Sequence, residues 1–309
     1  MEMVKMIQIV LLSGFLGAGK TTLMQRLLSS YEDHKIGVII NEFGEINIDA
    51  RLVSRDGIEM AELSNGSIFC ACIKDKFVDG LVAMSKKDIE YLFIEASGLA
   101  DPSNMEDIVA GIRRDTSDNY ILKGNICVVD GVSFLDLVEM LPALSRQVRH
   151  ANGVILNKMD LIDDETFSEI CEKIEEINPA VKVYAASHCD VDIKKLVDEL
   201  APAIVGSEDT TNTYESRPNT FIVHADEPVE REKLEQFLEA IAGDSYRIKG
   251  FAVTTEGTLE VSGVSTHIIY TPWEGDEKTE IVVISAVGIR MLSLITKYSG
   301  EIMEGRLYI

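Results

Sequence analysis

Apolar runs alternate with helical patterns from residue 7 to about residue 203. The runs are short and almost wholly apolar, as expected for strands buried on both faces, at 7–12, 36–40, 91–94, 126–129 and 153–156. Between them, apolar positions recur with helical spacing at 21–30, 74–85, 133–139, 166–177 and 192–200. This alternation predicts an α/β fold, with a mostly parallel sheet and helices on both faces.

The pattern changes after residue 205. A polar segment at 207–213 is poor in apolar residues and predicts a linker. Beyond it, strand patterns occur at 220–223, 247–254, 258–264 and 281–285, mixed with helical patterns at 230–241 and 288–298. We therefore expect a first domain over 1–205, a linker over 206–218, and a smaller C-terminal α+β domain over 219–309.

The segment from Gly14 to Thr22 reads GFLGAGKTT, which fits the pattern G-x-x-x-x-G-K-[ST] in full. It follows the first apolar run and precedes the first helical pattern, as a phosphate-binding loop requires. Its glycines free backbone amides to face a phosphate, while Lys20 would reach the β and γ phosphates and Thr21 would bind Mg²⁺. A P-loop NTPase-type domain is predicted, with nucleotide contacts from Gly14, Gly17, Ala18, Gly19, Lys20, Thr21 and Thr22.

A second motif, NKMD, indicates which base is bound. It follows the run at 153–156, at a strand end where α/β folds place ligands, and contributes Asn157, Lys158 and Asp160. Guanine carries donors at N1 and N2, so a buried carboxylate at Asp160 would accept both and favour GTP. Ser187 lies where backbone contact with the base is expected. Small-molecule kinases do not need NKMD, and lysine-signature ATPases need a lysine early in the phosphate loop, so both alternatives fit less well.

Two further strand ends carry residues that a nucleotide switch needs. After the run at 36–40, Glu42 and Asp49 lie in a carboxylate-rich loop that is predicted to be the first switch and to approach Mg²⁺; solvated loop acids are the alternative. After the run at 91–94, Glu95 would hold the metal through water and the Gly98 amide would sense the γ-phosphate. The predicted catalytic residues of a slow GTPase are therefore Lys20, Thr21, Glu95 and Gly98.

Together these segments resemble the CobW-type GTPases, which are relatives of UreG and HypB. The resemblance covers most of the chain and is carried by GFLGAGKTT, NEFGE, the N-G-x-x-x-C segment ending at Cys70, EASGLADP, NKMD and the late segment from Arg247 to Gly250. It implies a GTP-dependent metallochaperone or metal-cofactor insertion factor that handles Zn²⁺ or Co²⁺. It also implies a client metalloenzyme or corrinoid-pathway protein as partner.

The cysteine motif departs from the family pattern. Relatives usually read G-C-x-C-C after the first switch, whereas Ser67 and Phe69 replace two of those cysteines here. Cys70 keeps its place and Cys72 adds a second thiol, so the pair would supply two soft ligands. A tetrahedral site needs more, from Glu42, a distant histidine, a partner protein or a second copy of the chain in a homodimer. The alternative is that both cysteines pack in a tight loop and that the protein is a GTP-gated chaperone that holds no metal.

Composition narrows the classes of partner and location. The 309 residues are 46% hydrophobic, enough for a substantial core, and five unevenly spaced cysteines do not suggest a secreted disulfide framework. No segment is long and apolar enough to span a bilayer, so a cytoplasmic location is expected. A net charge of −23 at pH 7 repels nucleic acids and anionic membranes, since binding either relies on Lys and Arg. We expect neither as a partner.

Asp160→Asn is expected to shift nucleotide preference from GTP toward xanthosine triphosphate by at least about tenfold. The reason is that an amide donates where the carboxylate would accept, which suits the extra carbonyl of xanthine. Competition between the two nucleotides for the purified protein measures the shift. A variant that keeps the wild-type preference for GTP would contradict the assignment of Asp160.

Overall fold

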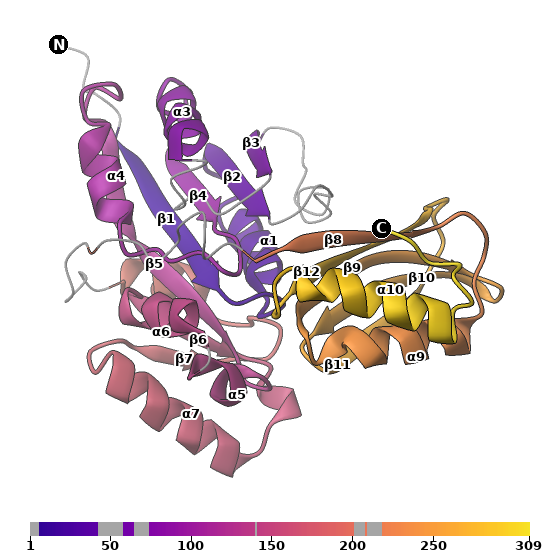
Figure 1. The fold of residues 1–309 in the computed structure, drawn as a ribbon. Coiled ribbons are helices and arrows are strands. Elements are labelled where there is room, and N and C mark those ends of the chain that lie inside the picture. Colours follow the sequence, from indigo (N-terminus) through magenta and orange to yellow (C-terminus); the bar gives the residue numbers. More distant parts are fainter. Residues whose placement is uncertain (1–5, 43–57, 65–73, 140, 201–207, 209–217) are drawn as a thin grey trace. The chain divides into compact units, whose positions relative to one another are not determined.

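The computed structural model describes residues 6–42, 58–64, 74–139, 141–200, 208 and 218–309. The chain divides into two compact units, residues 1–216 and 217–309, each with its own sheet and its own hydrophobic core (Figure 1). Among the described helices, none is long and apolar enough to cross a membrane.

The first unit is built on a seven-stranded sheet in the order β3-β2-β4-β1-β5-β6-β7. All neighbouring strands are parallel, which confirms the predicted α/β class. Parallel strands place their carboxyl ends on one edge of the sheet, where such folds bind ligands. The strands are β1 (Ile7–Gly14), β2 (Ile36–Glu42), β3 (Glu59–Ser64), β4 (Tyr91–Glu95), β5 (Tyr120–Asp130), β6 (Gly153–Asn157) and β7 (Val183–Ala185).

Helices cover both faces of this sheet. The helices are α1 (Lys20–Ser30), α3 (Lys74–Ser85), α4 (Met105–Gly111), α5 (Phe134–Val138), α6 (Pro142–Arg149), α7 (Asp164–Ile177) and α8 (Ile193–Asp198). Helices α1 and α8 share a core with Val10 and Leu12 of β1, whereas α3 and α4 share a second core with Ile9 and Leu11. Strand β1 is therefore buried on both sides, which explains why its residues are almost all apolar.

Three elements of the first unit were not predicted, and each has a weak sequence pattern. Strand β3 lies at the edge of the sheet and reads EMAELS, with no continuous apolar run. Helices α4 and α6 are short, and α6 contains two arginines in its last turn. Strand β5 begins at Tyr120 rather than residue 126, because its first part pairs with β1 through a register shift. Pairing and packing, rather than local pattern, define these elements.

The second unit has a five-stranded antiparallel sheet in the order β11-β10-β9-β12-β8, which agrees with the predicted α+β class. Helices α9 (Arg231–Ala242) and α10 (Arg290–Ile302) pack on one face, where Phe237 and Ile295 meet Val261. Strand β11 was not predicted, because most of its side chains are exposed at the sheet edge. The strands are β8 (Thr220–Ala225), β9 (Ser245–Thr254), β10 (Gly257–Val264), β11 (His267–Trp273) and β12 (Thr279–Ser285).

Gly250 of β9 lies tightly against β12, since an added Cβ would be 2.0 Å from the carbonyl oxygen of Glu280. Gly250→Ala is therefore expected to destabilise the second unit by about 1–3 kcal/mol, because a paired backbone cannot move aside as a side chain can. Urea unfolding followed by the fluorescence of Trp273, the only tryptophan in the sequence, measures this.

Gly300→Ala is the matched control on α10. A Cβ on this residue meets nothing within 4 Å, so alanine should stabilise the helix by about 0.5–1 kcal/mol. Equal unfolding midpoints for the two variants would contradict the close approach of β9 and β12.

Candidate nucleotide-binding site

The phosphate loop joins β1 to α1 and is closely packed at both ends. At Gly14 (φ 133°), an added Cβ would lie 2.3 Å from the carbonyl oxygen of Val128 in β5. At Gly19 (φ 115°), it would lie 2.5 Å from Nδ2 of Asn157 in β6. Both the backbone conformation and the space available therefore require glycine at these two positions.

Lys20 is the first residue of α1 and is only 7% exposed. Its Nζ donates to the carbonyl oxygens of Gly14 and Phe15, both at 3.0 Å. These bonds hold the ammonium group inside the loop, beside the N-terminus of the helix. A fixed positive charge and a set of helix amides that face the same small volume favour a phosphate group.

Thr21 and Glu95, the predicted magnesium ligands of the loop and of β4, are adjacent in the structure. The Thr21 hydroxyl donates to Oε1 of Glu95 at 3.2 Å, and Glu95 is buried. A hydroxyl and a carboxylate at this spacing supply the oxygen ligands that Mg²⁺ prefers. The residues present therefore fit the metal that the motif implies.

Gly98 lies directly against the phosphate loop. A Cβ on this residue would be 2.5 Å from the backbone nitrogen of Leu16. The chain reaches this place along β1, since the Ala96 amide donates to the Leu12 carbonyl at 2.9 Å. Because of this contact, a displacement of the loop would also displace Gly98. This agrees with the predicted role of the Gly98 amide as a sensor of the γ-phosphate.

Asn157 links the two motifs that the sequence placed far apart. Its Nδ2 donates to the Ala18 carbonyl at 2.8 Å, and its Oδ1 accepts from the Cys189 amide at 2.8 Å. The phosphate loop and the segment after β7 therefore meet on one buried side chain. Cys189 is also buried, and burial raises the pKa of its thiol to about 12, so it remains protonated and acts in packing.

Lys158 adopts a left-handed backbone conformation (φ 64°) and precedes a short 3₁₀ turn, Met159–Leu161. Its Nζ lies 2.6 Å from Oδ2 of Asp130, a buried carboxylate that ends β5. Asp130 was not among the predicted site residues, although it directly follows the apolar run at 126–129. A polar residue directly after an apolar run is the same signal that indicates Glu95.

Asp160 is exposed, whereas the sequence argument expected a buried carboxylate. Its backbone amide donates to the Ser187 hydroxyl at 3.1 Å, so the two predicted base-contacting residues lie together. Hydrogen bonding with Ser187 holds the pKa of the Asp160 carboxyl below its usual range. The carboxylate is therefore ionised at neutral pH, and its burial would require a bound base.

The remaining predicted metal ligands are not placed by the structure. Asp49, Cys70 and Cys72 lie outside the described residues, and Glu42 ends β2 with its side chain outside the described part. Within the described ranges, no group of three or more His, Cys, Asp or Glu side chains could hold a metal ion.

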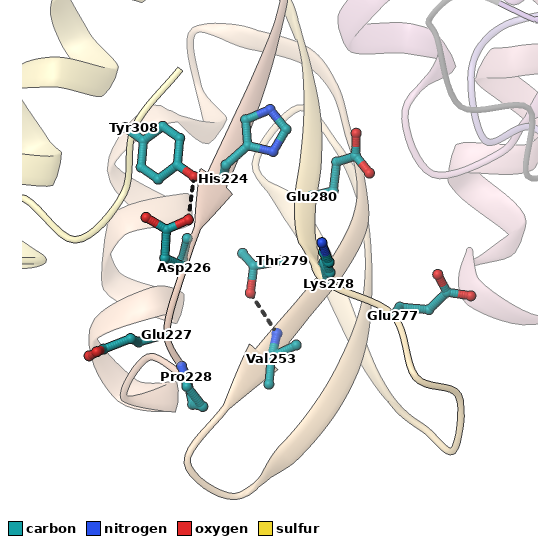
Figure 2. A pocket seen from close by; sticks show the side chains of 11 residues that line it. His224, Asp226, Glu227, Pro228, Val253, Glu277, Lys278, Thr279, Glu280 and Tyr308 are labelled. Carbon is teal, nitrogen blue, oxygen red and sulfur yellow. Dashed lines mark hydrogen bonds between the residues drawn. The ribbon is translucent and has the colours of Figure 1, made fainter.

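The second unit contains a pocket of about 450 Å³ beside β8 and the start of β12. The Tyr308 hydroxyl donates to Oδ1 of Asp226 at 2.7 Å, and the Val253 amide donates to the Thr279 hydroxyl at 2.9 Å (Figure 2). The acidic lining favours a cationic group over a phosphate, so this pocket is unsuited to a nucleotide. Its charged side chains are Asp226, Glu227, Glu277, Lys278 and Glu280.

Comparison with known proteins identifies the family. Residues 8–185 match the CobW/HypB/UreG nucleotide-binding domain, and residues 219–292 match the cobalamin synthesis protein CobW C-terminal domain. The chain therefore belongs to the CobW/HypB/UreG family, as the sequence motifs indicated.

Similar proteins include the zinc chaperone YjiA of Escherichia coli K12, which is 27% identical over 92% of this chain and 95% of that protein. The zinc-regulated GTPase metalloprotein activator 1 of Dictyostelium discoideum is 28% identical over 86% of this chain and 68% of that protein. Among solved structures, the zinc-bound YjiA GTPase from E. coli covers 96% of this chain and 98% of that chain, with 24% identity and a TM-score of 0.49.

Asn157→Asp is expected to weaken nucleotide binding by at least about tenfold. The new carboxylate still accepts from the Cys189 amide, but its second oxygen faces the Ala18 carbonyl, so a hydrogen bond is replaced by repulsion. Binding of a fluorescent GDP analogue measures the loss.

Asn178→Asp makes the same change at another buried amide, which donates to the carbonyl groups of Val148, Arg149 and Ala151. This control should keep nucleotide affinity within about twofold of wild type, although it will lower stability. Equal losses of affinity in both variants would contradict the specific role of Asn157.

Proposed function

We propose that this protein is a GTP-binding and GTP-hydrolysing metallochaperone or metal-cofactor insertion factor. Its nucleotide state is coupled to binding of Zn²⁺ or Co²⁺ near Cys70 and Cys72. The observation that carries the proposal is the Asn157 side chain, which joins the phosphate loop to the guanine-type motif in one site. The names of relatives, zinc chaperone and zinc-regulated GTPase metalloprotein activator, support a role in metal handling.

The phosphates and the base are bound at opposite ends of this site. Phosphate oxygens accept from the Lys20 ammonium and from the loop amides at Gly14, Gly17, Ala18, Gly19, Thr21 and Thr22. At the other end, the ionised Asp160 accepts the N1 and N2 donors of guanine. Asn157, Lys158 and Ser187 hold the backbone that presents this carboxylate.

Hydrolysis is the in-line attack of water on the γ-phosphate, which breaks the bond to the bridging β-phosphate oxygen and leaves GDP and phosphate. Lys20 stabilises negative charge on the β and γ oxygens, and the Gly98 amide donates to a γ oxygen. Thr21 and, through water, Glu95 would hold Mg²⁺, which would supply positive charge that offsets the charge on the phosphates. The intrinsic rate is slow, because this set of residues contains no arginine finger and no water-orienting glutamine.

Metal coupling follows from the order of segments along the chain. Glu42 and Asp49 belong to the predicted first switch, and Cys70 and Cys72 come after it. Movement of the switch toward GTP would assemble the thiolate site, and hydrolysis would release the metal to a client. A coupling of about 1–3 kcal/mol would change metal affinity about 5- to 150-fold.

A second candidate function is a GTP-gated chaperone for a corrinoid or other metalloenzyme that does not itself bind metal. The replacement of two family cysteines by Ser67 and Phe69 favours it. In either case, we propose a client metalloenzyme or corrinoid-pathway protein as partner, action in the cytoplasm, and the domain boundaries 1–205, 206–218 and 219–309. A homodimer is one way to complete the ligand set of the metal site.

Replacing both Cys70 and Cys72 by alanine separates the two functions. Under the metallochaperone proposal, the double variant should lose at least about tenfold in Zn²⁺ or Co²⁺ affinity, because two thiolate ligands are removed. Isothermal titration with each metal, with and without GTP, measures this. Cys127→Ala and Cys171→Ala together are the matched control, since these cysteines belong to β5 and α7 rather than to the predicted switch segment.

Unchanged metal affinity in the Cys70 and Cys72 double variant would remove the metal site and leave the second function. Wild-type metal affinity that does not depend on GTP would remove the coupling.

A further inference from the structure

The segment that follows β4, residues 97–103, is held by a side chain of α6. Gln147 is 1% exposed, and its Nε2 donates to the carbonyl oxygens of Gly98 at 3.2 Å and Ala100 at 2.8 Å. One carboxamide therefore fixes the carbonyl groups of the two residues that flank residue 99. Because the site is buried, a change in either carbonyl position would break a hydrogen bond that water cannot replace.

The preceding residue of α6 holds the next part of the same segment. Arg146 Nε lies 2.7 Å from Oδ2 of Asp101, whose side chain is fully buried, and Nη2 donates to the Ser103 hydroxyl at 3.2 Å. A buried carboxylate requires a charged partner of this kind. The Ser103 amide also donates to Oδ1 of Asp101 at 3.1 Å, so the segment is restrained over its whole length.

Arg146 also forms an ion pair with Glu208. Its Nη1 lies 3.0 Å from Oε2 of Glu208, and the Glu208 amide donates to the Ser103 carbonyl at 3.1 Å. Glu208 belongs to the first unit, which ends at residue 216. Arg146 therefore binds both the segment after β4 and Glu208, which lies near the end of the first unit.

On its other side, the segment contacts the phosphate loop through Gly98 and Leu16. It is thus enclosed between the loop, where the γ-phosphate would bind, and helix α6. The position of the Gly98 amide relative to the loop depends on how firmly α6 holds the Gly98 and Ala100 carbonyls. A side chain of α6 that does not contact the nucleotide can therefore set the position of the Gly98 amide, which would contact it.

We propose that Gln147, supported by Arg146, is a positioning residue for GTP hydrolysis that sets the place of the Gly98 amide against the phosphate loop. The inference rests on the proposed GTPase function and adds a residue to it. GDP has no γ-phosphate, so a loss of this positioning affects hydrolysis and leaves GDP binding intact.

Gln147→Met tests the proposal, because methionine has a similar length and volume but cannot donate to the two carbonyl groups. The single-turnover rate of GTP hydrolysis is expected to fall about tenfold, since a misplaced amide loses about one hydrogen bond to the transition state. GDP affinity should stay within about twofold of wild type. Gln147→Asn, with a carboxamide one methylene shorter, should also slow hydrolysis and serves if the methionine variant does not fold.

Asn119→Leu is the matched control. The Asn119 carboxamide is also buried and donates to the Ser85 carbonyl at 2.9 Å, and its backbone carbonyl bonds the Ile7 amide at the start of β1, the end opposite the phosphate loop. This variant should lose thermal stability as the Gln147 variants do, yet hydrolyse GTP at the wild-type rate.

Wild-type hydrolysis rates in both Gln147 variants, or an equal decrease in the Asn119 variant, would overturn the positioning role. Failure of the proposed function gives a different result. In that case the wild-type protein would not hydrolyse GTP, and Lys20→Ala would bind nucleotide as well as wild type does.

Discussion

The two hydrogen bonds of the Asn157 carboxamide are the constraint on which the arrangement of the site depends. The nitrogen holds the phosphate loop at Ala18, and the oxygen holds the segment after β7 at Cys189. Because the group is buried, loss of either bond would leave polar atoms unpaired. The same carboxamide also explains why residue 19 is glycine, because it occupies the space that a Cβ at this position would need.

The attraction for phosphate in this acidic protein is confined to the phosphate loop. The chain carries a net charge of −23, so its overall field opposes the approach of a triphosphate and slows association. Attraction is local and comes from Lys20 together with the N-terminus of α1. Lys158 contributes little to it, because Asp130 neutralises its ammonium group at 2.6 Å. Nucleotide affinity therefore depends on short-range contacts within the loop.

In the first sheet, sequence patterns predicted the central strands, which are buried on both faces, and in both sheets they missed an edge strand with a weak pattern. Strands β1, β4 and β6 are almost wholly apolar, whereas β3 and β11 lie at sheet edges and α6 is short and carries two arginines. Motifs likewise identified Lys20 and Asn157. Asp130 and Gln147 belong to no motif, and their importance appears only when strand order places β5 beside β6 and α6 beside the segment after β4.

The bonds from Lys20 to the carbonyls of Gly14 and Phe15 lie within the folded loop itself. A free lysine side chain has about 2 kcal/mol of rotamer entropy to lose when it is immobilised. Here that entropy is lost during folding, so its loss does not weaken the binding of a nucleotide. The entropy cost of ordering Lys20 therefore lowers the stability of the folded chain rather than the affinity for the ligand. Tight binding then does not require the loop to become ordered around its ligand.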